Sequence, residues 1–198
     1  MILEKIKSSF GAKQFILYFS NGKFFPVSPE DVLTLKLSSG QKISQAQYQQ
    51  TTHLSLSFLL KSYALRQLAI SPKSEKTLRL KLKHRYPQAT DSHLDQTIDY
   101  LRQKKLLNPQ DFLNYFLRRH PRKSARHLQY LLRREGINYS LPLENEVSKI
   151  LKILQHKKNT GKLLSQNPTK LRFMASLTRL GFSLNDVKIA IDEFLKSR

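Results

Sequence analysis

The side chains with the clearest chemical potential in this sequence are its lysines and arginines. The chain holds 35 of them against 14 Asp and Glu, which gives a net charge of +21. From Arg118 to Arg134 there are seven basic residues and no acidic one. A surface of this kind attracts polyanions, most often nucleic acid. The candidate binding residues are Arg79, Lys81, Lys83, Arg85, Arg118, Arg119, Arg122, Lys123, Arg126, Arg133, Arg134, Arg172 and Arg179.

Other chemistry finds little support in the sequence. The chain has no cysteine, no phosphate-binding glycine-rich loop and no nucleophile elbow, and its six glycines do not cluster. The six histidines lack metal-ligand spacing, and the acidic residues are too scattered for a two-metal site. We therefore expect no catalytic residues, no metal and no cofactor. No apolar run is long enough to span a membrane.

The basic residues recur on three segments, 71–86, 121–137 and 169–183, that share one helical pattern. Self-similarity of this kind marks a repeated supersecondary unit that buries its apolar face against its neighbours. The aligned apolar positions, which we expect to be buried, are Leu78, Leu128 and Phe173, followed by Leu82, Leu132 and Leu177. The common stop falls at Tyr86, Gly136 and Gly181.

The first part of the chain has a different character. Residues 15–19 and 24–27 are rich in aromatic and branched side chains, and Asn21-Gly22 lies between them. Asn-Gly in this position predicts a tight hairpin, because both residues tolerate positive φ. Residues 1–7 are a candidate third strand. Ser28-Pro29 then predicts a capped short helix.

From Gln45 onward the apolar spacing is helical. Thr90, Asn108, Asn167 and Ser183 each resemble a helix start. The predicted fold is mainly α, with three tandem three-helix repeats after a small module that contains a β-hairpin. The predicted domains are 1–50, 54–106, 107–154 and 155–198. The boundary between the last two stays open, because the polar run 155–160 and Gly161 could mark a break.

Three motifs in order resemble the RecX family, bacterial regulators of the RecA recombinase. They are PKSEKTL at 72–78, KLLNPQDF at 105–112 and LTRLGFS at 177–183. The match covers residues 60–196, with a looser likeness over 1–50. The chain departs from the family pattern at five places. Tyr86-Pro87 and Lys105 each replace a glycine, Pro109 replaces an acidic residue, Leu180 takes a position that is usually basic, and Ile70-Ser71 stands where the family often has arginine.

The resemblance implies a non-enzymatic, cytoplasmic, monomeric modulator that inhibits RecA. Such a protein would bind the RecA filament on single-stranded DNA and dampen its ATPase and strand exchange, with double-stranded DNA as a further partner. The basic positions on the repeats should then matter more than Lys5, Lys7 and Lys13 in the N-terminal module. The alternative is a stand-alone DNA- or RNA-binding protein without sequence specificity, or a basic surface that is merely solvated.

Overall fold

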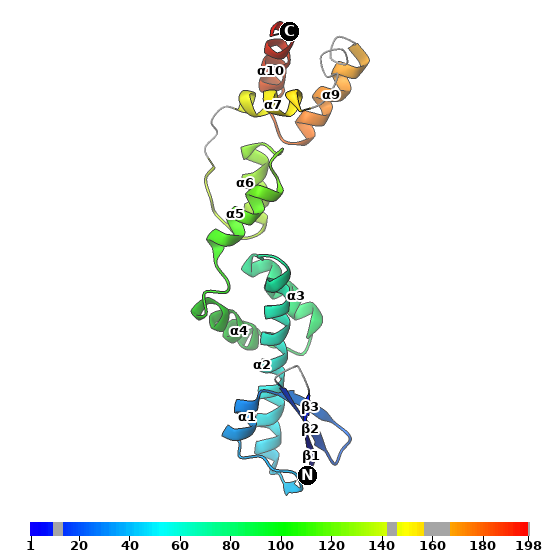
Figure 1. Ribbon diagram of the computed structural model, residues 1–198, viewed down its shortest axis with the longest axis vertical. Helices are drawn as coiled ribbons and strands as arrows, with labels where there is room; N and C mark the ends of the chain where they lie inside the picture. The colour runs from blue at the N-terminus through cyan, green and yellow to red at the C-terminus, as the bar shows by residue number, and fades with distance from the viewer. Residues whose placement is uncertain (10–13, 142–145, 157–166, 198) are drawn as a thin grey trace. The chain divides into compact units, whose positions relative to one another are not determined.

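The protein is mainly helical, with a small antiparallel sheet at its N-terminus (Figure 1), and this confirms the predicted fold class. The computed structural model describes residues 1–9, 14–141, 146–156 and 167–197. Contacts divide the chain into two compact units, Met1–Asn108 and Pro109–Arg198. Most of the predicted break at 155–161 lies outside the described residues. Lys13 also lies outside them.

The N-terminal sheet has four antiparallel strands in the order β3-β2-β1-β4. They are β1 (Ile2–Ser9), β2 (Gln14–Phe19), β3 (Phe24–Val27) and β4 (Gln41–Lys42). The predicted third strand is therefore real. The two-residue strand β4 was not predicted. It exists because Ile2 pairs with Lys42, a long-range contact that leaves no local sequence signal.

The hairpin between β2 and β3 turns at Asn21-Gly22, as predicted, but only Gly22 takes a positive φ, of 75°. The Phe19 N–H donates to the Lys23 carbonyl at 2.9 Å, which closes the turn. Asn21 contributes through its side chain instead, whose Oδ1 accepts a hydrogen bond from the Lys23 N–H at 3.1 Å. Asn-Gly thus marks the turn for a different reason at each position.

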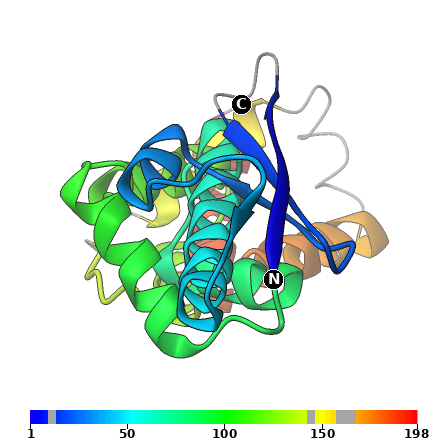
Figure 2. The same ribbon diagram turned by 90° about the horizontal axis from the view of Figure 1, so that it is seen from below.

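Two helices cover one face of the sheet. Helix α1 (Pro29–Thr34) begins with a Ser28 capping box and proline at its first turn. Helix α2 (Gln45–Ile70) packs Tyr48 edge-on against Phe19 and Phe25. Beneath them lies a core of Leu3, Leu17, Phe19, Val27, Leu37 and Ile43. Figures 1 and 2 both show α1 and α2 on the same side of the strands.

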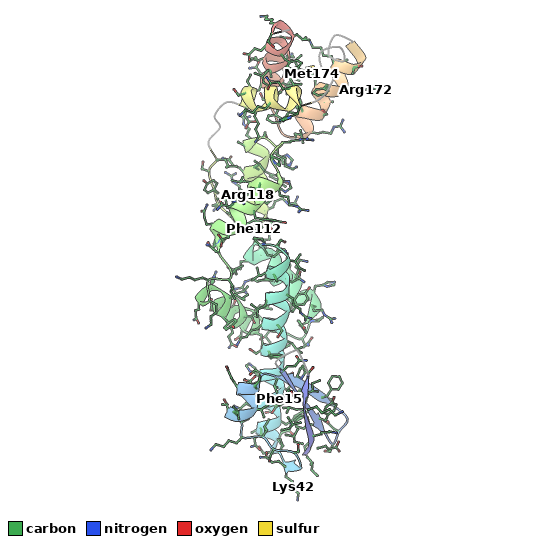
Figure 3. All side chains as sticks on the ribbon, viewed as in Figure 1. Phe15, Lys42, Phe112, Arg118, Arg172 and Met174 are labelled. Atoms are coloured by element: carbon green, nitrogen blue, oxygen red, sulfur yellow. The ribbon has the colours of Figure 1, made fainter. Side chains whose placement is uncertain are left out.

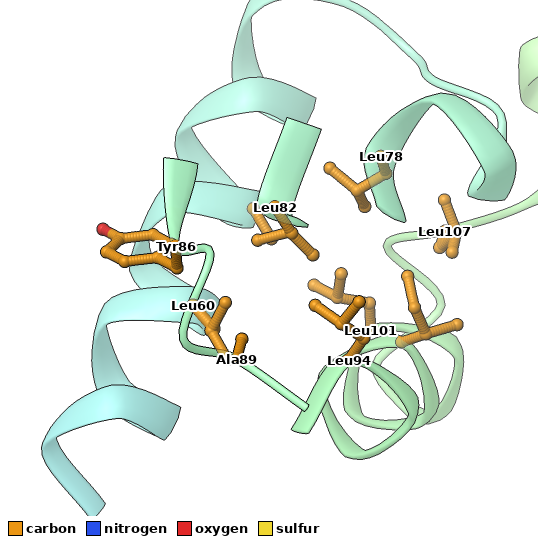
Figure 4. Packing of buried hydrophobic residues seen from close by; sticks show 10 residues of the cluster. Leu60, Leu78, Leu82, Tyr86, Ala89, Leu94, Leu101 and Leu107 are labelled. Carbon is orange, nitrogen blue, oxygen red and sulfur yellow. The ribbon is translucent and has the colours of Figure 1, made fainter. Parts of the chain in front are cut away.

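Helix α2 is continuous across the predicted boundary between 1–50 and 54–106. Its C-terminal half packs on α3 (Glu75–Arg85) and α4 (Asp91–Gln103), which Ser74 and Thr90 cap. The sheet module and the first helical cluster therefore share one helix. The cluster is shown in Figure 4, where its side chains converge between the three helices: Leu60, Ala64, Leu78, Leu82, Tyr86, Ala89, Leu94, Ile98, Leu101 and Leu107.

The second unit holds two further apolar clusters. One joins α5 (Pro109–Arg119) to α6 (Ala125–Arg134) through Phe112, Leu113 and Leu132. The other joins α7 (Glu146–Gln155), α9 (Asn167–Arg179) and α10 (Leu184–Lys196). Helix α7 belongs with the C-terminal helices, although all of it except Gln155 lies within the predicted repeat 107–154. The predicted repeat boundaries themselves stay a prediction.

The repeat positions behave as the sequence predicted. All six aligned apolar residues are buried, with at most 8% of any side chain exposed. The second and third repeats stop at glycines with φ of 80° and 92°, whereas Tyr86 ends the first at φ −130°. The first repeat thus stops without the left-handed turn, and the Tyr86 ring is buried against the cluster instead.

Substitution of Leu82 by alanine tests the packing of the first helical cluster. Leu82 and Leu80 lie on the same helix, but Leu82 is fully buried and Leu80 is 63% exposed. We expect Leu82→Ala to lower the free energy of unfolding by about 3 kcal/mol, because it leaves a cavity in the first cluster. Leu80→Ala is the matched control and should change it by less than about 0.5 kcal/mol. Urea titrations followed by circular dichroism measure both, and equal losses would contradict this core assignment.

Candidate nucleic-acid interface

Helices α5 and α6 carry the densest group of predicted basic residues. Arg118 and Arg119 lie in the last turn of α5, and Arg118 is labelled in Figure 3. The start of α6 is held firmly: the Ser124 Oγ accepts from the His127 N–H at 3.1 Å, and Glu146 Oε1 accepts from the Ala125 N–H at 2.7 Å. These contacts fix the direction in which the next side chains of α6 project.

One side of α6 is basic and solvent-exposed. Arg126, Tyr130, Arg133 and Arg134 follow each other at helical spacing and form what we call the α6 face, while Leu128 and Leu132 are buried. Tyr130 is 58% exposed, and the Arg134 guanidinium lies 5.9 Å from its ring centroid. An exposed aromatic ring can stack on a base of a nucleic acid, and the cations beside the ring can bind the phosphates.

Tyr130 shows what the sequence interpretation missed. Aromatic residues at helical spacing usually belong to a core, so the sequence alone does not single out Tyr130 as a binding residue. Its position relative to Arg126 and Arg133 was the available signal, because it shares their side of the helix.

The arginines of this region are exposed to solvent, and one of them, Arg126, lines a cavity together with Glu146 and Asp186. Arg118, Arg122, Arg126 and Arg133 are exposed, and within the described residues none of them forms an ion pair. Arg119 donates to the Tyr115 hydroxyl at 3.3 Å, a contact that leaves its charge uncompensated. The region therefore presents a positive potential to solvent.

A basic cleft of about 460 Å³ adds residues that the sequence did not single out. Arg122 lines it together with Lys149, Lys152 and His156, beside the apolar Pro121 and Ile153. The Lys149 Nζ also donates to the Lys123 carbonyl at 2.5 Å, which ties α7 to the loop before α6. Only the tertiary packing of α7 brings these cations to Arg122, so no local sequence signal identifies them.

The basic residues of α3 are engaged differently. Arg79 pairs with Glu75 at 3.0 Å and with Asp95 of α4 at 2.7 Å, so its charge is compensated within the fold. This pairing raises the pKa of Arg79 against the opposing effect of burial. Lys83 donates to the Ala89 carbonyl at 2.5 Å, Lys81 is half-buried and Arg85 is exposed beside the Tyr86 ring.

Helix α9 carries the remaining two predicted residues. Arg172 and Arg179 are both exposed, and Arg172 is labelled in Figure 3. Arg179 donates through Nε to the Ala175 carbonyl at 3.2 Å, one turn back along the helix. The thirteen predicted residues thus differ in surroundings, and α5, α6 and their connecting loop hold the largest uncompensated set.

Burial lowers the pKa of three histidines, and neighbouring positive charge adds to the effect. For His93 the second cause is His53, for His127 it is Lys123, and for His120 it is Lys123 followed by Arg119. The folded protein therefore favours neutral imidazole at these positions, whereas the unfolded chain takes up protons near the usual pKa of about 6.5.

Acidification should consequently weaken the fold. Because the unfolded state binds more protons, stability is complete above about pH 6.5 and falls as the pH drops toward the lowered folded-state values. Urea midpoints between pH 7.5 and 5.5 should therefore decrease. The double variant His120→Gln/His127→Gln should show a shallower decrease, and an unchanged decrease would mean that other groups titrate.

In the part of the chain that the structure describes, no group of three or more His, Asp or Glu residues could hold a metal ion. None of the helices described is both long enough and apolar enough to cross a membrane. What the structure offers is thus a basic helical surface and a small sheet.

The fold of this protein is similar to that of a known structure. The sequence matches no family model and no curated protein. Among solved structures, the whole chain resembles one described as the crystal structure of regulatory protein RecX. The TM-score is 0.64, the identity is 18%, and the alignment covers 100% of this chain and 99% of that one. The protein therefore has a RecX-like fold.

Proposed function

We propose that this protein is a non-enzymatic regulator of the RecA recombinase that acts on the RecA filament formed on single-stranded DNA and inhibits it. The observation that supports this most strongly is the likeness to RecX over the whole chain, N-terminal sheet included. The three RecX-like motifs add to it, since they lie at α3, at the start of α5 and at the turn between α9 and α10. The site of action would be the cytoplasm.

The basic surface gives this proposal a physical basis. Exposed guanidinium groups on α5 and α6 would contact phosphates of the DNA in the filament or acidic side chains of RecA. Arginine suits both, because its planar fork binds carboxylate and phosphate through paired hydrogen bonds. Several weak contacts on one chain then add through effective concentration, so no single one needs to be strong.

A second candidate, a nucleic-acid-binding protein without a recombinase partner, is favoured by the α6 face itself. Exposed Tyr130 beside Arg126, Arg133 and Arg134 would suit DNA or RNA whether or not RecA is present. The two candidates share the surface and differ in the partner, so the test must include RecA.

The decisive measurement is the ATPase rate of the cognate RecA on single-stranded DNA while this protein is titrated at low salt. We expect the rate to fall at stoichiometric or lower amounts relative to RecA. Unchanged turnover at several-fold excess would reject the recombinase proposal, and retained DNA binding in the same buffer would favour the second candidate. A variant with Arg126, Arg133 and Arg134 changed to Glu should inhibit much less.

A further inference from the structure

The N-terminal sheet has one face that no element of its own unit covers, among the residues described. Helices α1 and α2 pack on the other face (Figures 1 and 2). Leu17, Phe19 and Val27 are buried there. Side chains alternate between the two faces of a strand. The uncovered face, which we call the open face, therefore carries Lys5, Lys7, Ile16, Tyr18, Phe24 and Pro26.

The strand register arranges these side chains in two rows. Lys5 pairs with Tyr18, which pairs with Phe24, and Lys7 pairs with Ile16, which pairs with Pro26. Each row thus runs from a lysine on β1 to apolar side chains on β2 and β3. Because neighbouring strands lie about 5 Å apart, the groups form one continuous patch.

Of the aromatic pair, Phe24 is exposed and Tyr18 is half-buried, and neither belongs to the core of the sheet. Phe24 is 63% exposed, and its ring centroid lies 6.2 Å from that of Tyr18 with the planes tilted by 35°. The Lys7 ammonium lies 5.4 Å from the Tyr18 ring centroid. An exposed phenylalanine on a sheet that already has a complete core contributes little to folding.

Charge indicates the kind of partner. Lys5 and Lys7 are exposed on this face and Lys23 is exposed in the adjoining turn, while the acidic residue of these strands, Glu4, lies at the bulge of β1. Within the described residues, none of the three lysines forms an ion pair with a carboxylate. Aromatic rings beside ammonium groups that form no ion pair are complementary to a nucleic-acid strand, which has both flat bases and phosphates.

We propose that the open face is a binding platform for single-stranded nucleic acid, separate from the α6 face. Bases stack on Tyr18 and Phe24, and phosphates lie against Lys5, Lys7 and Lys23. Antiparallel sheets with exposed aromatic residues bind unpaired bases in this manner, because every base has a face that can stack. A duplex is a poor ligand here, since its bases are already stacked on each other.

The test separates stacking from charge with two probes, labelled oligo(dT) and an abasic oligonucleotide of equal length, in the absence of RecA. Fluorescence anisotropy should show that Tyr18→Ala/Phe24→Ala weakens oligo(dT) binding about tenfold or more. Binding of the abasic probe should not change, because its phosphates remain. Lys5→Gln/Lys7→Gln should weaken binding of both probes. It should also lower the magnitude of the slope of log K against log salt by about 0.7 for each phosphate that the variant no longer binds.

Two controls keep the outcome unambiguous. Leu33→Ala/Ile70→Ala removes apolar side chains that are 78% and 75% exposed elsewhere in the unit, and it should leave both affinities unchanged. Tyr18→Phe/Phe24→Tyr keeps both rings and should retain oligo(dT) binding. If Tyr18→Ala/Phe24→Ala changes the affinity for both oligonucleotides equally, or for neither, the platform is rejected. An unchanged affinity for both is also the result expected if this face binds a protein partner instead. Neither result bears on the inhibition of RecA.

Discussion

Reversing Arg126, Arg133 and Arg134 to Glu should weaken single-stranded DNA binding by roughly 100- to 1,000-fold at low salt. Each phosphate bound on a single strand releases counterions and adds about 0.7 to the slope of log K against log salt. A variant that binds three fewer phosphates should therefore show a slope whose magnitude is smaller by about 2. Anisotropy titrations across a series of salt concentrations measure both quantities on one sample.

The control for this variant must carry the same change in net charge. Arg66→Glu/Lys104→Glu/Lys188→Glu reverses three exposed cations outside α5 and α6. This control should lose affinity only through long-range attraction, about tenfold or less at low salt and less still when salt screens it. A neutral version, with glutamine at positions 126, 133 and 134, guards against local repulsion near the end of α6. Equal losses in the two triple reversals would mean that binding follows overall charge and not the α6 face.

The elements that could be predicted from the sequence are those with local causes. Proline and a capping hydroxyl set the start of α1, Asn21-Gly22 sets the hairpin, and the apolar spacing sets the buried repeat positions. Each signal lies within a few residues of the feature that it produces. Repetition strengthened the prediction, because Leu78, Leu128 and Phe173 lie the same number of residues before the stops of their segments.

Features that depend on tertiary contacts could not be predicted. Strand β4 exists only through its pairing with β1, and Arg79 is compensated only because α4 brings Asp95 to it. The basic cleft likewise needs α7 to place Lys149 and Lys152 beside Arg122. For the candidate site, the sequence therefore identified basic residues but not which of them keep their charge available to a partner.

Gly181 carries the largest expected effect on stability. Its φ is +92°, and it lies in the turn between α9 and α10. A Cβ built at this position would lie 2.5 Å from both the Cβ of His127 and the Oγ of Ser124. The same turn receives a hydrogen bond of 2.9 Å from the Ser124 N–H to the Leu180 carbonyl. Gly181 thus allows the capped start of α6 to pack directly against this turn.

Gly181→Ala should accordingly lower the free energy of unfolding by about 2–6 kcal/mol. Backbone strain contributes about 1–3 kcal/mol, and displacement of Ser124 weakens both a buried hydrogen bond and the cap of α6, at a further 1–3 kcal/mol. Gly40→Ala is the matched control, because Gly40 has a similar φ of +82° but no atom within 4 Å of its built Cβ. It should cost only about 1–2 kcal/mol. Urea denaturation of both variants measures the difference, which is the contribution of close packing between α6 and the turn. If the two substitutions cost the same, the packing at Gly181 adds nothing beyond backbone conformation.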